Sequence, residues 1–485
     1  MSFKRGTLYL TAAWASLPIT GYVLNVWLAR TFGPEEYGIY GLVMSILMWL
    51  EIFVITGLPY AVQKFVASDE SNAYPILWTA GRFQLGMVVV LFTVCFFLAP
   101  LLGTVFRNDR FIFYFRIATF HLVFYGFFHL LVSFQNGLRH FGKQALLFFV
   151  YSLSKLGFVF LLVSLFHTLT GAFLANAAGS LLGLAVGLFF LNERKERPSH
   201  RTGEILRFAI PTLLFTVTFT LLLYLDLWVV SFHWGDVLRG HYVAASMVAR
   251  IPYFLVLGLS STVLPTVSWN LASDALEQVR STIASSMRFL LMVTLPIGIL
   301  LMMFSHETMA LLYSSEYLPG GNILTVLIWG NTLLAFLLLL ATVIIADHRP
   351  KLAFGITGAI VILDAVLNLI LVPGRGAMGG AISTTLAAGV GVLMTLAAVY
   401  IRFRVLIRLK SLVRIGLAAA AMGLGLWLWD VHGNGFVLAM VLGIVFYGAL
   451  LMVFKEITPQ DFRHILPRKE REETAASPYG DALPM

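Results

Sequence analysis

Fourteen apolar segments, each long enough to cross a hydrocarbon core about 30 Å thick, follow one another along almost the whole chain. They occupy residues 8–31, 38–60, 82–106, 111–135, 144–166, 170–191, 205–231, 241–268, 284–304, 322–346, 352–372, 377–401, 411–430 and 435–454. Backbone polar groups inside a bilayer must be satisfied within the segment itself, which favours helices. The sequence therefore predicts an all-α polytopic membrane protein with about 14 transmembrane helices.

The composition excludes a soluble chain. The 485 residues are 59% hydrophobic and 12% charged, whereas soluble proteins carry about 25% charged residues. The first apolar segment runs on to about Ala29 without a small-residue cleavage site, so we interpret it as a retained first span. The single cysteine, Cys95, lies inside an apolar segment and allows neither an intrachain disulfide nor a cysteine-based metal site.

The positions of Lys and Arg orient the predicted spans, because cytoplasmic loops retain cations and exported loops do not. With the N-terminus inside, 25 of the 33 Lys and Arg residues fall in inner segments, and three lie within spans. The outer segments hold the other five, which are Arg30, Arg107, Arg110, Arg239 and Arg375. The sequence thus predicts a multi-pass protein of the inner, cytoplasmic membrane with both termini in the cytoplasm. The net charge of +9 then follows from topology, and no nucleic-acid partner is predicted.

The outer loops are short, and the longest runs from about Ser305 to Gly321. Membrane glycosyltransferases, polymerases and ligases usually need a larger external segment to hold a sugar acceptor. The sequence also has no nucleotide-binding loop and no hydrolase or metalloprotease motif. We therefore predict that the protein is not an enzyme and has no cofactor, apart from a coupling ion, H⁺ or Na⁺.

Two nearly equal offsets indicate an internal repeat. An offset of 205 places Tyr37 on Tyr242, and an offset of 208 places Gly171 on Gly379. Because six spans is an even number, the two lobes share one orientation, as in parallel-repeat transporters. The predicted organisation is an N-lobe with spans 1–6, a C-lobe with spans 7–12, spans 13–14 and a cytoplasmic tail, at residues 1–192, 193–404, 405–456 and 457–485.

Three segments resemble a known family. They are LARTFGPEEYGIYGL (28–42), the stretch from Asp226 through GHYVAASMVARIPYFLVLGLSSTVLP (226–265) and NLILVPGRGAMGGAISTTLA (368–387). The chain is similar here to the polysaccharide-transport branch of the multidrug/oligosaccharidyl-lipid/polysaccharide flippase superfamily. The resemblance covers most of the chain and implies fourteen helices in two lobes that work by alternating access.

The same resemblance bears on the cargo. In the related lipid II flippases, an arginine in span eight, followed by a short apolar run and a proline, lines a cationic central cavity. Arg250, Ile251 and Pro252 match that pattern. The chain has no counterpart of the acidic and arginine-rich motif that those flippases carry at span two. The resemblance therefore implies an undecaprenyl-linked oligosaccharide unit, as in O-antigen, capsule or exopolysaccharide export, rather than lipid II.

Charged side chains within spans are costly, by about 2.5–3.5 kcal/mol each on insertion scales, and usually face a bundle interior. Six occur here, namely Glu51, Arg116, Lys155, Asp226, Arg250 and Asp364. A pyrophosphate headgroup needs fixed cations in a low dielectric. We assign Arg250, Lys155 and Arg116 to the cargo phosphate and the three carboxylates to a coupling ion or a gate. Asn25 is a further candidate substrate contact.

Each assignment has a structural alternative. Lys155 could pair with Asp364, and Arg250 with Asp226, as neutral pins between helices. Arg116 could extend to the membrane surface. Asn25 and Asn176 could bond to the backbone instead of a sugar. His121 and His129 could join a proton path or be ordinary packing residues.

Three classes of function follow. The first is a flippase that moves a polyprenyl-linked oligosaccharide across the membrane, with membrane lipids and a polysaccharide polymerase or glycosyltransferase as partners. The second is a lipid II flippase or a cation-coupled multidrug exporter of the same superfamily, and an exporter predicts a cavity dominated by carboxylates. The third is a non-transporting scaffold of a polysaccharide-synthesis complex, in which loss of the intramembrane charges leaves export intact.

Overall fold

The computed structural model describes residues 3–191, 202–429 and 435–456, and these ranges contain helices but no strand. The helices are α1 (Phe3–Ile55), α2 (Leu58–Ser68), α3 (Ala73–Val105), α4 (Asp109–Gly137), α5 (Phe141–Phe166), α6 (Leu169–Phe189), α7 (Thr202–Leu221), α8 (Leu225–His233), α9 (Asp236–Ala249), α10 (Ile251–Ala272), α11 (Leu276–Met303), α12 (Ser305–Leu312), α13 (Gly320–Ala346), α14 (Pro350–Phe403), α15 (Leu409–Trp429) and α16 (Phe436–Val453), with 3₁₀ turns at Glu70–Asn72 and Ser315–Tyr317. The predicted tail lies outside the described residues.

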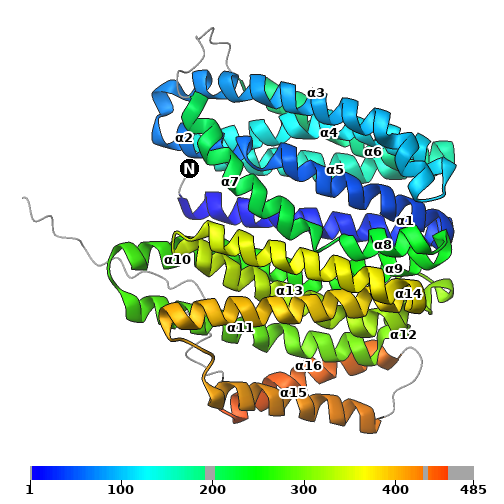
Figure 1. The fold of residues 1–485 in the computed structure, drawn as a ribbon, viewed down its shortest axis with the longest axis vertical. Coiled ribbons are helices and arrows are strands. Elements are labelled where there is room, and N and C mark those ends of the chain that lie inside the picture. Colours follow the sequence, from blue (N-terminus) through cyan, green and yellow to red (C-terminus); the bar gives the residue numbers. More distant parts are fainter. Residues whose placement is uncertain (1–2, 192–201, 430–434, 457–485) are drawn as a thin grey trace, which may run out of the picture. The chain divides into compact units, whose positions relative to one another are not determined.

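Two of these helices are hairpins. The 53 residues of α1 and the 54 of α14 would each extend about 80 Å if straight, far more than one membrane crossing. Each is interrupted by a glycine with positive φ, Gly33 at 73° and Gly376 at 59°, where a side chain would be strained. Figure 1 shows the dark-blue α1 running out and returning.

The predicted number of spans agrees with the helices. In the described ranges, eleven helices are long and apolar enough to cross a membrane, or twelve if α7 and α8, bent by 43° at their junction, form one span. Counting α1 and α14 as two passes each gives fourteen. The seventh span, predicted as continuous, is therefore broken between Leu221 and Leu225, although this stretch contains neither proline nor glycine.

The chain divides into two compact units, residues 1–406 with α1–α14 and residues 407–485 with α15 and α16. We call the end of the first unit that carries Gly33 and Gly376 the distal end, and the opposite end, where α1 begins, the proximal end. The charge distribution predicts that the distal end lies outside the cell. Within the second unit, α15 packs on α16, and Arg414 lies 3.7 Å from Glu456.

The repeat noted in the sequence has a structural counterpart. Gly171 lies in the first turn of α6, and a Cβ at that position would lie 2.5 Å from the carbonyl oxygen of Leu162 on α5. Gly379 begins the second pass of α14, and a Cβ there would lie 2.6 Å from the carbonyl carbon of Leu371. Both glycines allow a helix to approach the backbone of the preceding one closely, and they occupy matching places under the 208-residue offset.

Candidate functional site

Arg250 lies where two broken helices face each other. The break between α9 and α10 falls at Arg250 because Pro252 has no N–H to continue the helical hydrogen bonds. At the opposing break, the N–H of Leu227 bonds to the Asp226 carboxylate at 2.7 Å instead of to a helical carbonyl. The carbonyl of Leu223 is then free to accept a hydrogen bond from the Arg250 guanidinium at 2.5 Å.

The positive charge of Arg250 has no carboxylate at ion-pair distance among the described residues. Its guanidinium carbon lies 4.4 Å from the centroid of the Tyr224 ring, and the side chain is half-buried. The Tyr224 hydroxyl contacts the sulfur of Met48 at 3.5 Å, one turn before Glu51 on α1. A carbonyl and an aromatic face thus contact Arg250, and Asp226 interacts with it electrostatically from beyond ion-pair distance. The guanidinium is therefore able to bind an anion.

Lys155 is a second intramembrane cation without an ion pair in the part of the chain that the structure describes. Its Nζ lies 5.9 Å from the centroid of the Tyr151 ring, one turn earlier on α5. Gly179 on α6 brings the helices together at this point, since a Cβ there would lie 3.0 Å from the Cα of Lys155. Glu51 is the charged group that interacts with Lys155 electrostatically.

Asp226 and Asp364 are held by neutral groups. Asp226 accepts hydrogen bonds from the Tyr242 hydroxyl at 2.5 Å and from Thr384 at 3.0 Å. Asp364 accepts one from the Asn368 amide at 3.0 Å. The alternative pairings, Lys155 with Asp364 and Arg250 with Asp226, are therefore absent from the described residues.

The carboxylate cluster, which we define as Asp226, Tyr242, Asp364, Asn368 and Thr384, fits a bound cation. Asp364 and Asn368 are completely buried, and Oδ2 of the former and Oδ1 of the latter have no hydrogen-bond partner. The two carboxylates also interact electrostatically with each other. Two buried carboxylates that interact need a proton or a metal ion, and Oδ2 of Asp364 is the carboxylate oxygen left without a partner. Carboxylate, amide and hydroxyl oxygens are ligands for hard cations.

Glu51 lies in a separate polar group near α4 and α6. Its Oε1 is 3.1 Å from Nε2 of His121, and both residues are buried. The other ring nitrogen of His121 lies 3.0 Å from the backbone oxygen of Asn176 and 3.2 Å from the hydroxyl of Ser180. Within the described ranges, Glu51 thus shares no hydrogen-bond or ion-pair partner with Asp226 or Asp364, the other two carboxylates predicted to bind a coupling ion.

Arg116 and Asn25 have local partners. Arg116 donates to the carbonyl of Phe96 on α3 at 3.2 Å and lies over that ring at 4.7 Å. Asn25 donates to the carbonyl of Gly21 at 2.9 Å and accepts from the Tyr37 hydroxyl at 2.9 Å, which links the two passes of α1. Their substrate roles stay predictions, and the contacts of Asn25 match its backbone alternative.

The distal end is closed by contacts between α1 and α9. A Cβ at Gly240 would lie 2.7 Å from the carbonyl carbon of Pro34, and one at Gly38 would lie 2.8 Å from the nitrogen of Gly240. The Tyr22 hydroxyl bonds to the carbonyl of Met247 at 2.8 Å. At the proximal end, contacts between α1–α6 and the later helices run mainly through α7. The distal closure therefore depends on positions without side chains.

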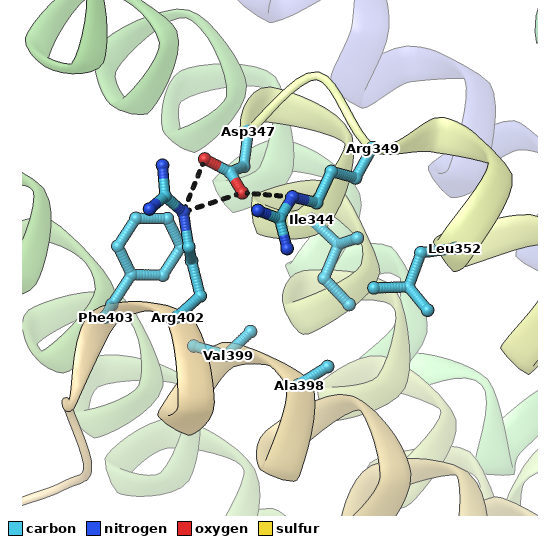
Figure 2. A pocket seen from close by; sticks show the side chains of 8 residues that line it. All are labelled: Ile344, Asp347, Arg349, Leu352, Ala398, Val399, Arg402 and Phe403. Atoms are coloured by element: carbon cyan, nitrogen blue, oxygen red, sulfur yellow. Dashed lines mark hydrogen bonds and ion pairs between the residues drawn. The ribbon is translucent and has the colours of Figure 1, made fainter.

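A pocket at the proximal end lies outside the predicted site. Its carboxylate, Asp347, ends α13 and pairs with Arg349 and Arg402, each at 3.1 Å (Figure 2). These two cations come from the start and the end of α14, so the pairs tie three helix ends together. Both belong to the inner loops of the predicted topology.

Several site residues were not identified from the sequence. Tyr242 was noted only as a repeat position, and Asn368 and Thr384 only within the family segment. Asn368 follows Asp364 by four residues, so both occupy one helix face, and this spacing could have indicated a shared site. Tyr224 has no sequence signal, because its importance comes from the helix break beside it.

The fold is that of the transporters of the MOP superfamily. A lipid II flippase, MurJ in an inward closed conformation, aligns with a TM-score of 0.77 at 18% identity, over 94% of this chain and 100% of that chain. A multidrug resistance MATE family transporter in an inward-facing conformation aligns with a TM-score of 0.68 at 15% identity, over 80% of this chain and 98% of that chain. The chain is a multi-pass membrane protein with this fold.

The family follows from the sequence match. Residues 3–271, more than half of the chain, match the model of the polysaccharide biosynthesis protein family, and the chain belongs to that family. A similar curated protein is the probable low-salt glycan biosynthesis flippase Agl15 of Haloferax volcanii, 22% identical over 370 residues, which are 76% of this chain and 77% of that protein.

Proposed function

We propose that the protein flips an undecaprenyl-pyrophosphate-linked oligosaccharide repeat unit from the cytoplasmic to the outer leaflet by alternating access, for cell-surface polysaccharide synthesis. The supporting observation is that Arg250 and Lys155 lie within spans and lack ion pairs among the described residues. A cation without an ion pair is costly within a membrane, and a pyrophosphate headgroup would supply a negative charge in direct contact. The polyprenyl tail would stay in lipid during transport.

In the structure, the Leu223 carbonyl occupies Arg250, and the cargo phosphate would compete with that carbonyl for the guanidinium. Its hydrogen bond to the Leu223 carbonyl is a bond to a neutral acceptor, and a phosphate oxygen is a stronger partner. Cargo binding would therefore remove the hydrogen bond between Arg250 and the Leu223 carbonyl at the break between α7 and α8. We infer that this exchange couples the headgroup to the bend of the seventh span.

The carboxylate cluster would hold the coupling ion, H⁺ or Na⁺. Asp364 and Asn368 present the unpartnered oxygens, and Asp226 adds the second carboxylate. The ion would lower the cost of the two negative charges, so the gradient of that ion is the proposed energy source. In this proposal the protein is not an enzyme. It acts in the inner membrane with both termini cytoplasmic, beside a polymerase or glycosyltransferase.

The test uses a host whose surface glycan depends on this protein. Replacing Arg250 by Ala should reduce surface glycan and accumulate the lipid-linked precursor in the inner leaflet, while Arg250→Lys should retain part of the export. Lys351→Ala, which removes an exposed cation, is the matched control. Normal surface glycan in the Arg250→Ala strain, at normal protein level, would contradict the phosphate role of Arg250.

Two other functions have specific support. The likeness to MurJ and to MATE transporters keeps lipid II and drugs as alternative cargoes, and the carboxylate cluster suits a cation-coupled exporter. Drug resistance that depends on Asp364 but not on Arg250 would favour the exporter. Export that survives loss of all intramembrane charges would favour the scaffold.

A further inference from the structure

Glu51 and His121 lie in direct contact, with 3.1 Å between Oε1 and Nε2. His121 Nδ1 faces the backbone oxygen of Asn176, which only accepts, so Nδ1 carries a hydrogen. The Ser180 hydroxyl donates to the carbonyl of Ala177 at 2.9 Å and therefore also accepts at Nδ1. With Nδ1 protonated, the other nitrogen of a neutral ring bears a lone pair. That nitrogen can lie 3.1 Å from a carboxyl oxygen only if one proton lies between them.

The pair holds one shared proton, whichever of the two residues carries it. It can belong to an imidazolium beside a carboxylate or to a carboxylic acid beside a neutral imidazole, and the pair is neutral in both. Release of the proton would leave one negative charge on a pair that is 1% exposed at His121 and 8% exposed at Glu51. A buried, unpaired carboxylate is costly, so it would attract the nearest cation.

Among the described residues, one cation lies in the surroundings of the pair. The titratable groups that face it are Tyr40 on α1, Tyr125 and His129 on α4, Tyr151 and Lys155 on α5, and Tyr224 between α7 and α8. The tyrosines are neutral at ordinary pH, and Nε2 of His129 is buried without a hydrogen-bond partner, which favours a neutral ring. Lys155 is the cation that can respond to Glu51.

We propose that Glu51 and His121 form a proton-binding site whose occupancy decides whether Lys155 is available to an anionic cargo. With the proton bound, the pair is neutral and the ammonium of Lys155 is free for phosphate. With the proton released to water, the Glu51 carboxylate becomes the counter-ion of Lys155. Proton and anion therefore bind cooperatively, and each must favour the other equally. The inference rests on the proposed function, because it needs a phosphate-bearing cargo.

The test measures proton uptake by the full-length protein in nanodiscs, with undecaprenyl pyrophosphate as the probe. Calorimetric titrations in two buffers of different ionisation enthalpy give the number of protons taken up for each lipid bound. Above the pH at which the pair releases its proton, we expect uptake to approach one proton. The affinity should then weaken by up to about tenfold for each further pH unit.

Glu51→Gln is the informative variant, because its amide N–H can still donate to Nε2 of His121 without sharing a proton. It should bind the probe without proton uptake. At every pH its affinity should equal the affinity that the wild type reaches at low pH. Lys155→Met should bind weakly at every pH and also without uptake. Glu204→Gln, which removes an exposed carboxylate of α7, should behave as the wild type.

The outcomes separate the two proposals. Wild-type binding without proton uptake would overturn this inference and leave the proposed function standing, and so would unchanged uptake in Glu51→Gln. No binding of the probe at any pH would overturn the phosphate site of the proposed function and this inference with it. The wild-type measurement decides even where a variant fails to fold.

Discussion

The closed distal end depends on Gly240, and a single methyl group there should open it. In Gly240→Ala, the new Cβ would lie 2.7 Å from the carbonyl carbon and 2.9 Å from the Cα of Pro34, and nearer still to the carbonyl oxygen. Ordinary contact begins near 3.4 Å, so α1 and α9 must separate by at least about 0.7 Å. All three atoms belong to the backbone, so no rotamer change can relieve the overlap.

The expected magnitude follows from overpacking. Extra atoms in a packed interface cost about 1–3 kcal/mol. If the halves separate instead of unfolding, this cost changes the ratio of closed to open molecules by about 5–150-fold. Because alternating access requires both states, we expect the substitution to shift the population and to leave the secondary structure intact.

A cysteine at Val243, which faces Gly41 across the interface, reports the opening through its rate of reaction with a maleimide in the purified protein. The only native cysteine, Cys95, is buried and 3% exposed, so the background is low. Gly258→Ala is the matched control, because a Cβ at Gly258 meets nothing within 4 Å. Equal labelling rates in the two alanine variants, with both proteins folded, would refute the reasoning.

Two further predictions concern the ion and the topology. Na⁺ or acid should stabilise the wild type by ligand linkage, by about 2.7 kcal/mol at a concentration 100 times the dissociation constant, and so raise its melting temperature. Asp364→Asn should lose this rise, while the exposed Asp109→Asn keeps it. An ion response retained in Asp364→Asn would contradict the coupling role. Alkaline phosphatase fused at His167, at the distal end, should be active and a fusion at Ser71 inactive, and the reverse pattern would contradict the predicted orientation.

The fold was largely predictable because its determinants are local. Apolar length alone marks a span, and Gly33 and Gly376 lie at the turns between predicted spans. The break in the seventh span was not predictable. It arises where the Asp226 side chain takes the N–H of Leu227, and no proline or glycine announces it.

The sequence predicted which charged residues belong to the candidate site. It did not predict which of them contact one another. Charge within an apolar segment identified Glu51, Lys155, Arg250 and the other ionisable residues. Which charges meet depends on how each helix is rotated about its axis, and the sequence of one helix does not encode its rotation relative to another. The alternative pairing of Lys155 with Asp364 was therefore reasonable, and hydrogen bonds from neutral groups replace it in the structure.

The sequence by itself determined that this chain spans a membrane, about how many times, and which few charges its spans contain, because the cost of burying a polar group in lipid acts on each segment separately. Only the tertiary structure decided the partners of those charges. Asp226 and Asp364 accept hydrogen bonds from neutral donors, Glu51 lies beside His121, and Arg250 donates to the carbonyl of Leu223. The physical reason is that an ion pair needs two atoms within about 4 Å, and helix packing sets that distance.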